Sequence, residues 1–83
     1  MDVERFFWTE HAEMRLGQRR LEAADVEQAI KDGHLDREVN DGRAQWLIGG
    51  VTPDGVSFEA IYDHPHGGDE HAVRIVSVWR LDS

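Results

Sequence analysis

The sequence predicts an α+β domain in which two N-terminal helices pack on one face of a three- to four-stranded antiparallel sheet. Apolar residues recur at helical spacing within residues 10–32. Turn signals follow at Asn40–Gly42 and Thr52–Gly55, and they separate apolar runs that are typical of strands. Helices followed by consecutive strands favour this fold class over an alternating α/β plan.

Length and composition predict one domain spanning residues 1–83. The chain is 40% hydrophobic, which is enough for one modest core, and it has no cysteine, which excludes disulfides and thiolate metal sites. It has no signal-peptide pattern and no apolar run near the ~20 residues of a membrane helix, so we expect a cytoplasmic protein. Its formal net charge of −8 opposes nucleic-acid binding unless basic residues gather locally.

The first helix is expected to run from about Glu10 to Gly17 or Arg19. Thr9 precedes it and is a suitable N-cap, because a threonine hydroxyl can accept a hydrogen bond from the first helical turn. The aromatic run at residues 6–8 comes before this cap. We expect it to pack on the core.

The second helix is expected from about Ala23 to Asp32. Glu22 holds the N-cap position, and Gly33 is placed to end the helix as a left-handed C′ residue. The apolar residues that define the buried side of this helix are Ala23, Val26, Ala29 and Ile30.

Three or four strands are expected after the helices, at 44–51, 56–62 and 72–81, with a short segment at 35–39 as the optional fourth. The strand at 72–81 is apolar on both faces near its middle, which suits an inner strand. Simple alternation places Val73, Ile75, Ser77 and Trp79 on one face of it, and Arg74, Val76, Val78 and Arg80 on the other. The large aromatic residues expected to be buried in the sheet are Trp46, Phe58 and Trp79.

Positive charge is concentrated in the first helix. His11, Arg15 and Arg19 recur every four residues, so they lie within roughly 80° of one another on the helix, while Arg20 points elsewhere. One interpretation is structural: arginine stems cover apolar surface, and their charges pair with acids such as Glu22 or Asp25. The other is a phosphate site, because arginine binds phosphate oxygens and histidine transfers protons near neutral pH.

The stretch HAEMRLGQRRLEAADVEQAIKDG, residues 11–33, resembles the signature of the Domain of Unknown Function 4258 family. That signature reads H-A-x-x-R-Φ-x-x-R-x-Φ and then D-V-x-x-A-I-x-x-G, where Φ is apolar. The matching residues are His11, Ala12, Arg15, Leu16, Arg19, Leu21, Asp25, Val26, Ala29, Ile30 and Gly33. The TPDG turn and the closing IVSVW are also similar to the family, so the resemblance touches nearly the whole chain.

The resemblance implies a relationship to the RelE and barnase class of metal-independent ribonucleases, which includes toxins of bacterial toxin–antitoxin systems. It implies a site at His11, Arg15 and Arg19, with no metal or other cofactor. We add Ser77 and Arg80 of the last strand as candidate contributors from the sheet, without a motif match. The implied partners are RNA or the ribosome, and an antitoxin.

A second interpretation remains open, in which the domain is a non-catalytic relative whose acidic surface binds a basic protein. The sequence does not decide whether the chain is an enzyme or which oligomer it forms, and it suggests no membrane partner.

Three histidines, His64, His66 and His71, lie near carboxylates in the segment DHPHGGDEH, residues 63–71. Imidazole and carboxylate groups can bind zinc. Pro65 and the two glycines are typical of an ordinary hairpin loop. We therefore expect an exposed, mobile loop that holds no metal.

Overall fold

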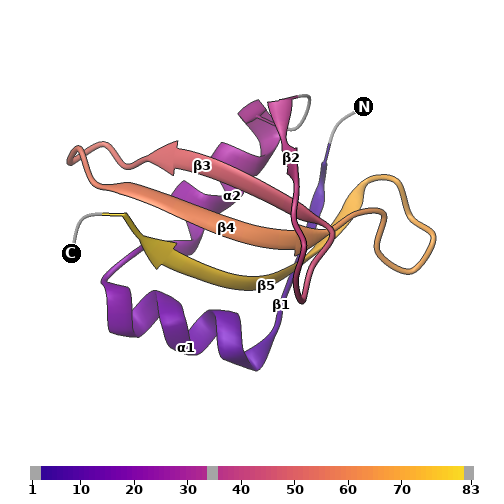
Figure 1. Ribbon diagram of the computed structural model, residues 1–83, viewed down its shortest axis with the longest axis horizontal. Helices are drawn as coiled ribbons and strands as arrows, with labels where there is room; N and C mark the ends of the chain where they lie inside the picture. Colours follow the sequence, from indigo (N-terminus) through magenta and orange to yellow (C-terminus); the bar gives the residue numbers. More distant parts are fainter. Residues whose placement is uncertain (1–2, 34–35, 82–83) are drawn as a thin grey trace.

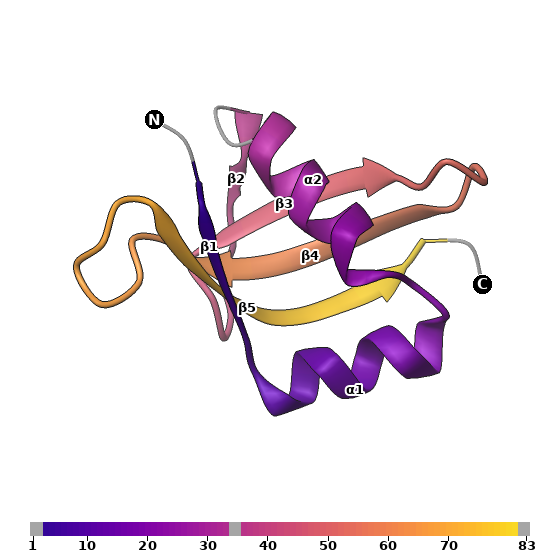
Figure 2. The same ribbon diagram turned by 180° about the vertical axis from the view of Figure 1, so that it is seen from behind.

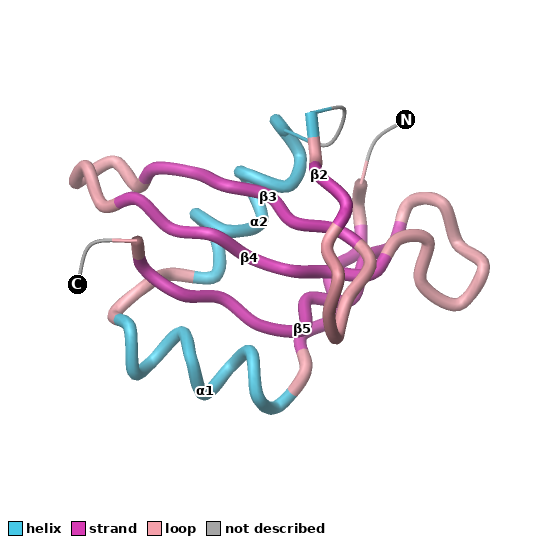
Figure 3. The backbone as a smooth tube through the Cα atoms, in the orientation of Figure 1, coloured by secondary structure: helices cyan, strands magenta, loops and turns pink. Residues whose placement is uncertain are grey.

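The computed structural model describes residues 3–33 and 36–81, which form two helices and a five-stranded sheet (Figures 1 and 3). In chain order the elements are β1 (Arg5–Trp8), α1 (Glu10–Arg19), α2 (Ala23–Gly33), β2 (Glu38–Val39), β3 (Trp46–Val51), β4 (Ser57–Asp63) and β5 (Ala72–Arg80). The predicted α+β class is confirmed. No helix in this part of the chain has the length and apolar character needed to cross a membrane.

The sheet has the order β1-β5-β4-β3-β2 and is mixed, not purely antiparallel. The strands from β2 to β5 pair antiparallel, whereas β1 pairs parallel to the first half of β5, from Arg5 opposite Ala72 to Trp8 opposite Ile75. The extra strand is the aromatic run that we expected only to pack on the core. Its backbone completes the sheet, and β5 becomes an inner strand as predicted.

The two helices share one core on one side of the sheet, as predicted, but they occupy different places. Helix α2 crosses behind β3 and β4, while α1 lies along β5 beyond the end of β1 (Figures 1 and 2). The buried residues of this core include Ala12, Leu21, Val26, Ile30, Ile48, Phe58, Ala60, Tyr62, Val73, Ile75 and Val78.

The opposite side of the sheet carries a smaller apolar cluster. Ala44, Ile61 and Val76 are buried there, and Leu47 and Trp79 pack partly against them. Neither helix covers this side. It forms the floor of the site described below.

A β-bulge in β5 changes which side chains reach each side. Ile61 pairs with Ser77, but the next residue on β4, Tyr62, pairs with Ile75, so Val76 has no partner. Simple alternation is therefore wrong after Val76: the strand gains one residue, and every later side chain changes side. Val78 joins Val73 and Ile75 in the helix-side core, while Ser77 and Trp79 lie on the other side.

Burial agrees only in part with the predicted aromatic core. Phe58 is buried, whereas Trp46 and Trp79 are half-buried. Both indoles donate hydrogen bonds from Nε1, Trp46 to the His64 carbonyl at 3.3 Å and Trp79 to Glu59 Oε1 at 3.2 Å. Each ring thus has an apolar part against the sheet and a polar edge near the surface.

The helix ends show one confirmed cap and one correction. Thr9 caps α1, accepting a hydrogen bond from the Ala12 backbone nitrogen at 3.0 Å. Gly33 is not left-handed: it is the last residue of α2, where a Cβ would lie 2.6 Å from Ile48 Cδ1. Close packing on β3 therefore favours glycine there. The left-handed residue is Arg20, at φ 56° and ψ 43°, which ends α1.

The strand bounds differ from the predicted ones by one or two residues, apart from β2. The first predicted strand is reduced to Glu38–Val39, and Leu35 lies outside the described residues. The TPDG turn is confirmed: Gly55 has φ +85°, and Thr52 Oγ1 accepts from the Val56 nitrogen at 3.0 Å.

Candidate functional site

A basic cleft opens between α1 and the side of the sheet that the helices leave uncovered. Its volume is about 240 Å³. We call it the α1–β5 cleft, and its lining residues are His11, Arg15, Arg19, Arg43, Ile61, Ser77, Val78 and Trp79. Of the residues proposed from sequence, His11, Arg15, Arg19 and Ser77 meet here.

The direction of the basic stripe on helix α1 is set by the adjacent flank of the helix, which is fixed in the core. Ala12 is fully buried and Leu16 packs against the same core. The basic stripe, whose residues are spaced four apart, therefore lies on the side of the helix that lines the cleft. Thr9 anchors the start of the helix to the sheet: its hydroxyl donates to the Val76 carbonyl at 3.1 Å while it accepts from the first turn.

The sheet supplies the floor of the cleft through the bulge in β5. Without the extra residue at Val76, Ser77 and Trp79 would share a side with Ile75, which is in the helix-side core. With it, they lie on the uncovered side of the sheet and line the cleft together with Ile61 of β4. The Trp79 ring is held by its hydrogen bond to Glu59. The floor is therefore mostly apolar and has one hydroxyl.

Arg43 is a cleft residue that sequence reasoning missed. It lies in the connection between β2 and β3, outside any motif, and its Nη2 lies 3.4 Å from His11 Nε2. No local pattern connects it to α1, because the two residues meet only when the sheet is complete. Together with Arg15 and Arg19, it is one of three arginines that line the cleft.

The charged side chains that line the cleft are basic. No carboxylate is among the described residues that line it, and Arg15, Arg19 and Arg43 form no ion pair with a described acidic residue. Arg15 instead donates to Gln18 Oε1 at 3.1 Å. The pairing with Glu22 or Asp25 expected under the structural interpretation is thus not formed, and the cleft is positive in a chain of net charge −8.

Two other basic residues lie away from this cleft. Arg80 pairs in register with Phe58, whose ring is in the helix-side core, and Arg80 is not among the cleft residues. Arg20 is exposed at the end of α1 and borders a separate hollow with Asp54.

The histidine-rich loop is more enclosed than predicted. His64 is buried, with 5% exposure, which corrects the expectation of exposure at this residue, whereas Pro65, Gly67, Gly68 and Glu70 are exposed as expected. The His64 Nδ1 lies 2.9 Å from Arg37 Nη1, and its Nε2 lies 2.8 Å from the Glu70 carbonyl. Since Arg37 can only donate, Nδ1 accepts and Nε2–H donates, which is a neutral ring. Asp69 pairs with Arg5 at 2.6 Å.

No group of three or more His, Cys, Asp or Glu side chains in the described part of the chain is placed to hold a metal ion. His64 uses both ring nitrogens in hydrogen bonds, which leaves neither for a metal.

Arg37 is the centre of a partly buried polar cluster under β4. Its guanidinium lies 3.8 Å from the centre of the Trp46 ring, a cation–π contact. Burial raises the pKa of the Tyr62 hydroxyl, and the nearby Arg37 charge opposes that rise. His64, Trp46 and Tyr62 are buried or half-buried, and Arg37 is not among the residues that line the cleft, so we interpret this cluster as structural.

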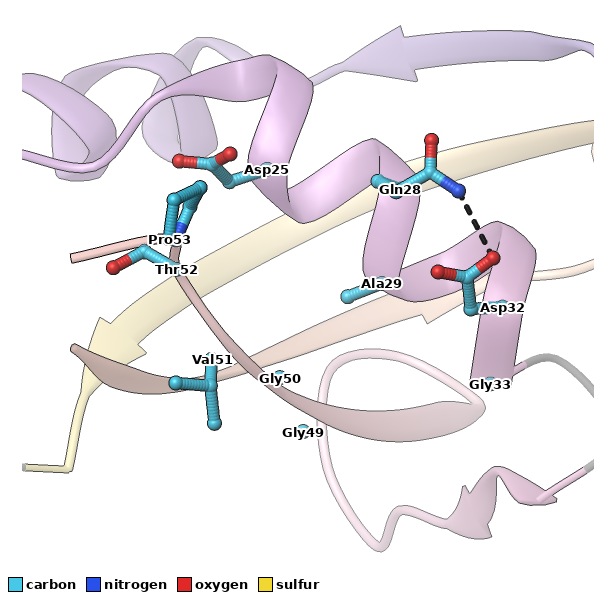
Figure 4. Close-up of a pocket in the computed structure, with 10 residues that line it drawn as sticks. All are labelled: Asp25, Gln28, Ala29, Asp32, Gly33, Gly49, Gly50, Val51, Thr52 and Pro53. Atoms are coloured by element: carbon cyan, nitrogen blue, oxygen red, sulfur yellow. Dashed lines mark hydrogen bonds between the residues drawn. The ribbon is translucent and has the colours of Figure 1, made fainter. Parts of the chain in front are cut away.

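A larger hollow lies between α2 and the end of β3 (Figure 4). Its volume is about 470 Å³, and Asp25, Gln28 and Asp32 border it opposite the glycines of β3. Gln28 donates to Asp32 Oδ1 at 2.9 Å. None of the described residues that line it is basic, so its carboxylates disfavour an anionic ligand. The smaller α1–β5 cleft, which three arginines line, is the more basic of the two.

Comparison with known proteins gives one result. No curated protein and no solved structure matches the chain. A family model matches residues 8–80, which includes every residue of the α1–β5 cleft and all elements from α1 to β5. The chain therefore belongs to the family described as Domain of unknown function (DUF4258).

Proposed function

We propose that this domain binds the phosphate backbone of RNA in the α1–β5 cleft and cleaves it without a metal ion. The supporting observation is the convergence of one imidazole and three guanidiniums that have no carboxylate partner among the described residues. Guanidinium groups bind phosphate oxygens through paired hydrogen bonds, and an imidazole can carry a proton at neutral pH.

The proposed reaction uses few groups. His11 takes the proton from a 2′-hydroxyl, whose oxygen attacks the adjacent phosphorus, and the bond to the 5′-oxygen breaks. The products are a 2′,3′-cyclic phosphate and a 5′-hydroxyl, which receives its proton from the imidazolium or from water. Arg15, Arg19 and Arg43 would stabilise the extra negative charge on the phosphorane.

The biological setting we propose is that of a ribonuclease toxin. A chain of net charge −8 has weak general attraction to nucleic acid. Binding would then depend on the local field of the cleft, or on a ribosome that presents the RNA.

The test compares wild type, His11→Ala, Arg15→Ala and the control Arg20→Gln on total RNA, with and without ribosomes, in the presence of a chelator. Circular dichroism checks that each variant is folded. We expect His11→Ala to lose about 10²–10⁴-fold in rate. We expect Arg20→Gln, which lies outside the cleft, to cut normally. Absence of cleavage by wild type in both formats, or full activity of His11→Ala, would reject the proposal.

A non-catalytic role is the alternative, and one observation favours it. The hollow beside α2 presents Asp25 and Asp32 at its rim (Figure 4), and the whole chain is strongly acidic. A basic protein would suit that surface. Pull-down with a basic partner that Asp25→Asn/Asp32→Asn abolishes, with no RNA cut by wild type, would support this alternative.

A further inference from the structure

The α1–β5 cleft has two chemically different walls. Arg15, Arg19 and Arg43 line one side with His11, whereas the sheet lines the other with Ile61, Ser77, Val78 and Trp79. A site for phosphate alone needs only the cationic wall. An apolar, aromatic floor beside it suits a ligand that has a flat apolar part joined to an anion, and a nucleotide has both parts.

Trp79 is the residue of the floor best suited to hold a base. It is half-buried, so part of its ring surface remains accessible, and its packing against the Ile61 cluster supports it from the sheet. The hydrogen bond from Nε1 to Glu59 Oε1, at 3.2 Å, restrains the ring. A restrained, accessible indole beside phosphate-binding arginines is the arrangement with which proteins bind unpaired bases by stacking.

The bulge at Val76 is a second reason to assign Trp79 a role. It breaks the pairing of two inner strands, and its effect is to place Ser77 and Trp79 on the side of the sheet where the cleft opens. Bulges commonly lie where a strand must re-aim a side chain next to a site. The extra residue therefore puts the indole into the basic cleft.

We propose that Trp79 is the base-stacking platform of the cleft, so that the ligand is single-stranded RNA with one base on the indole and neighbouring phosphates on Arg15 and Arg19. This inference rests on the proposed RNA-binding function and adds the substrate class. Bases within a duplex are already stacked and paired, so their faces are not available to Trp79. The volume of about 240 Å³ is small for a ligand pocket, which suits one nucleotide of a chain that continues outside.

The experiment measures separately how much the base and the phosphates contribute to binding. Binding is measured at one low salt concentration for three probes: a short single-stranded 2′-O-methyl oligoribonucleotide, which cannot be cleaved, an abasic oligomer of the same length, and pyrophosphate. We expect wild type to bind the base-containing oligomer about 5- to 150-fold more tightly than the abasic one, the usual range for one stacked base.

Three variants identify the platform. Trp79→Leu should remove the preference for bases and weaken pyrophosphate binding far less than it weakens binding of the base-containing oligomer. Trp79→Phe, which keeps an aromatic face, should retain most of the preference. Trp46→Leu is the matched control, because Trp46 is also half-buried and hydrogen-bonded but does not line the cleft. If Trp79→Leu fails to fold, equal affinity of wild type for the base-containing and abasic oligomers would still overturn the assignment.

The outcomes distinguish this inference from the proposed function. Base-dependent binding that Trp79→Leu abolishes, without any RNA cleavage, would uphold the platform and reject the nuclease. Cleavage with equal affinity for base-containing and abasic oligomers would uphold the nuclease and reject the platform. Loss of base preference in Trp46→Leu, to the same degree as in Trp79→Leu, would also overturn the assignment.

Discussion

The Arg43 guanidinium lies beside the His11 imidazole, with Nη2 3.4 Å from Nε2, although the residues are 32 positions apart. Because a guanidinium only donates, a hydrogen bond between the two groups has His11 Nε2 as its acceptor. A bound phosphate would compete for Arg43 and release the lone pair of Nε2. That nitrogen is then free to act as the base in the proposed reaction.

Arg43→Gln should weaken the binding of single-stranded RNA to a similar extent for all sequences. A phosphate contact contributes charge neutralisation, not base recognition, so the slope of log K against log salt should fall by roughly 0.7. Filter binding across a salt series measures this. Arg20→Gln removes the same charge from an exposed position outside the cleft and should change the slope less. Equal effects of the two changes would mean that the cleft has no special affinity for phosphate.

Thr9→Ala should lower the free energy of unfolding by about 1–2 kcal/mol, because one side chain makes two bonds. Its hydroxyl oxygen accepts from the Ala12 N–H at 3.0 Å, and its O–H donates to the Val76 carbonyl at 3.1 Å. Thr9→Ser keeps both bonds and should lose far less. Urea denaturation of the two variants provides the measurement. A loss in Thr9→Ser as large as that in Thr9→Ala would show that the methyl group, not the hydroxyl, is responsible.

Features set by neighbouring residues were predictable from the sequence. The cap at Thr9, the span of α1 and the TPDG turn depend on local hydrogen bonds and on the allowed backbone angles of Pro53 and Gly55, and all three are confirmed. The stripe of His11, Arg15 and Arg19 follows equally from helical periodicity.

Features set by distant residues were not predictable. The parallel pairing of β1 depends on β5, more than sixty positions away, and no local pattern shows that a short aromatic run will find that partner. The single extra residue of the bulge in β5 moves every later side chain to the other side of the sheet, so alternation placed Val78 and Trp79 incorrectly. Arg43 reaches the cleft only through the completed sheet. The buried position of His64 likewise depends on Arg37, in another part of the chain.

Tyr62 should titrate above the ordinary tyrosine pKa of 10.0, because burial disfavours the phenolate more than the Arg37 charge favours it. It is the only tyrosine in the chain, so ultraviolet difference absorbance follows it directly.

The raised pKa also sets the sign of the effect on stability. Tyr62 has the lower pKa in the unfolded chain, so it ionises there first as pH rises. The stability that its buried, protonated hydroxyl contributes is therefore complete below about pH 10 and is lost as pH rises through the folded pKa. Tyr62→Phe should therefore reduce the alkaline loss of stability. A Tyr62 pKa at or below 10 in the folded protein would contradict this prediction.

Two glycines should respond in opposite directions to the same change. Gly17 lies within α1, and a Cβ there would meet nothing within 4 Å, so Gly17→Ala should stabilise the protein by about 0.5–1 kcal/mol through the lower backbone entropy of the unfolded chain. Gly50 lies in β3 under α2, where a Cβ would be 2.7 Å from Phe58 Cζ and 2.8 Å from Ala29 Cβ. Gly50→Ala should therefore destabilise by about 1–3 kcal/mol, the usual cost of overpacking.

Thermal denaturation of the two variants measures the contrast, since 1 kcal/mol corresponds to about 4–8 °C in a domain of this size. The pair tests the close approach of α2 to β3, because each variant controls for the general effect of adding a methyl group. A stabilised Gly50→Ala would mean that α2 does not pack on β3 as closely as these distances require. A destabilised Gly17→Ala would mean that the outer side of α1 is covered in solution.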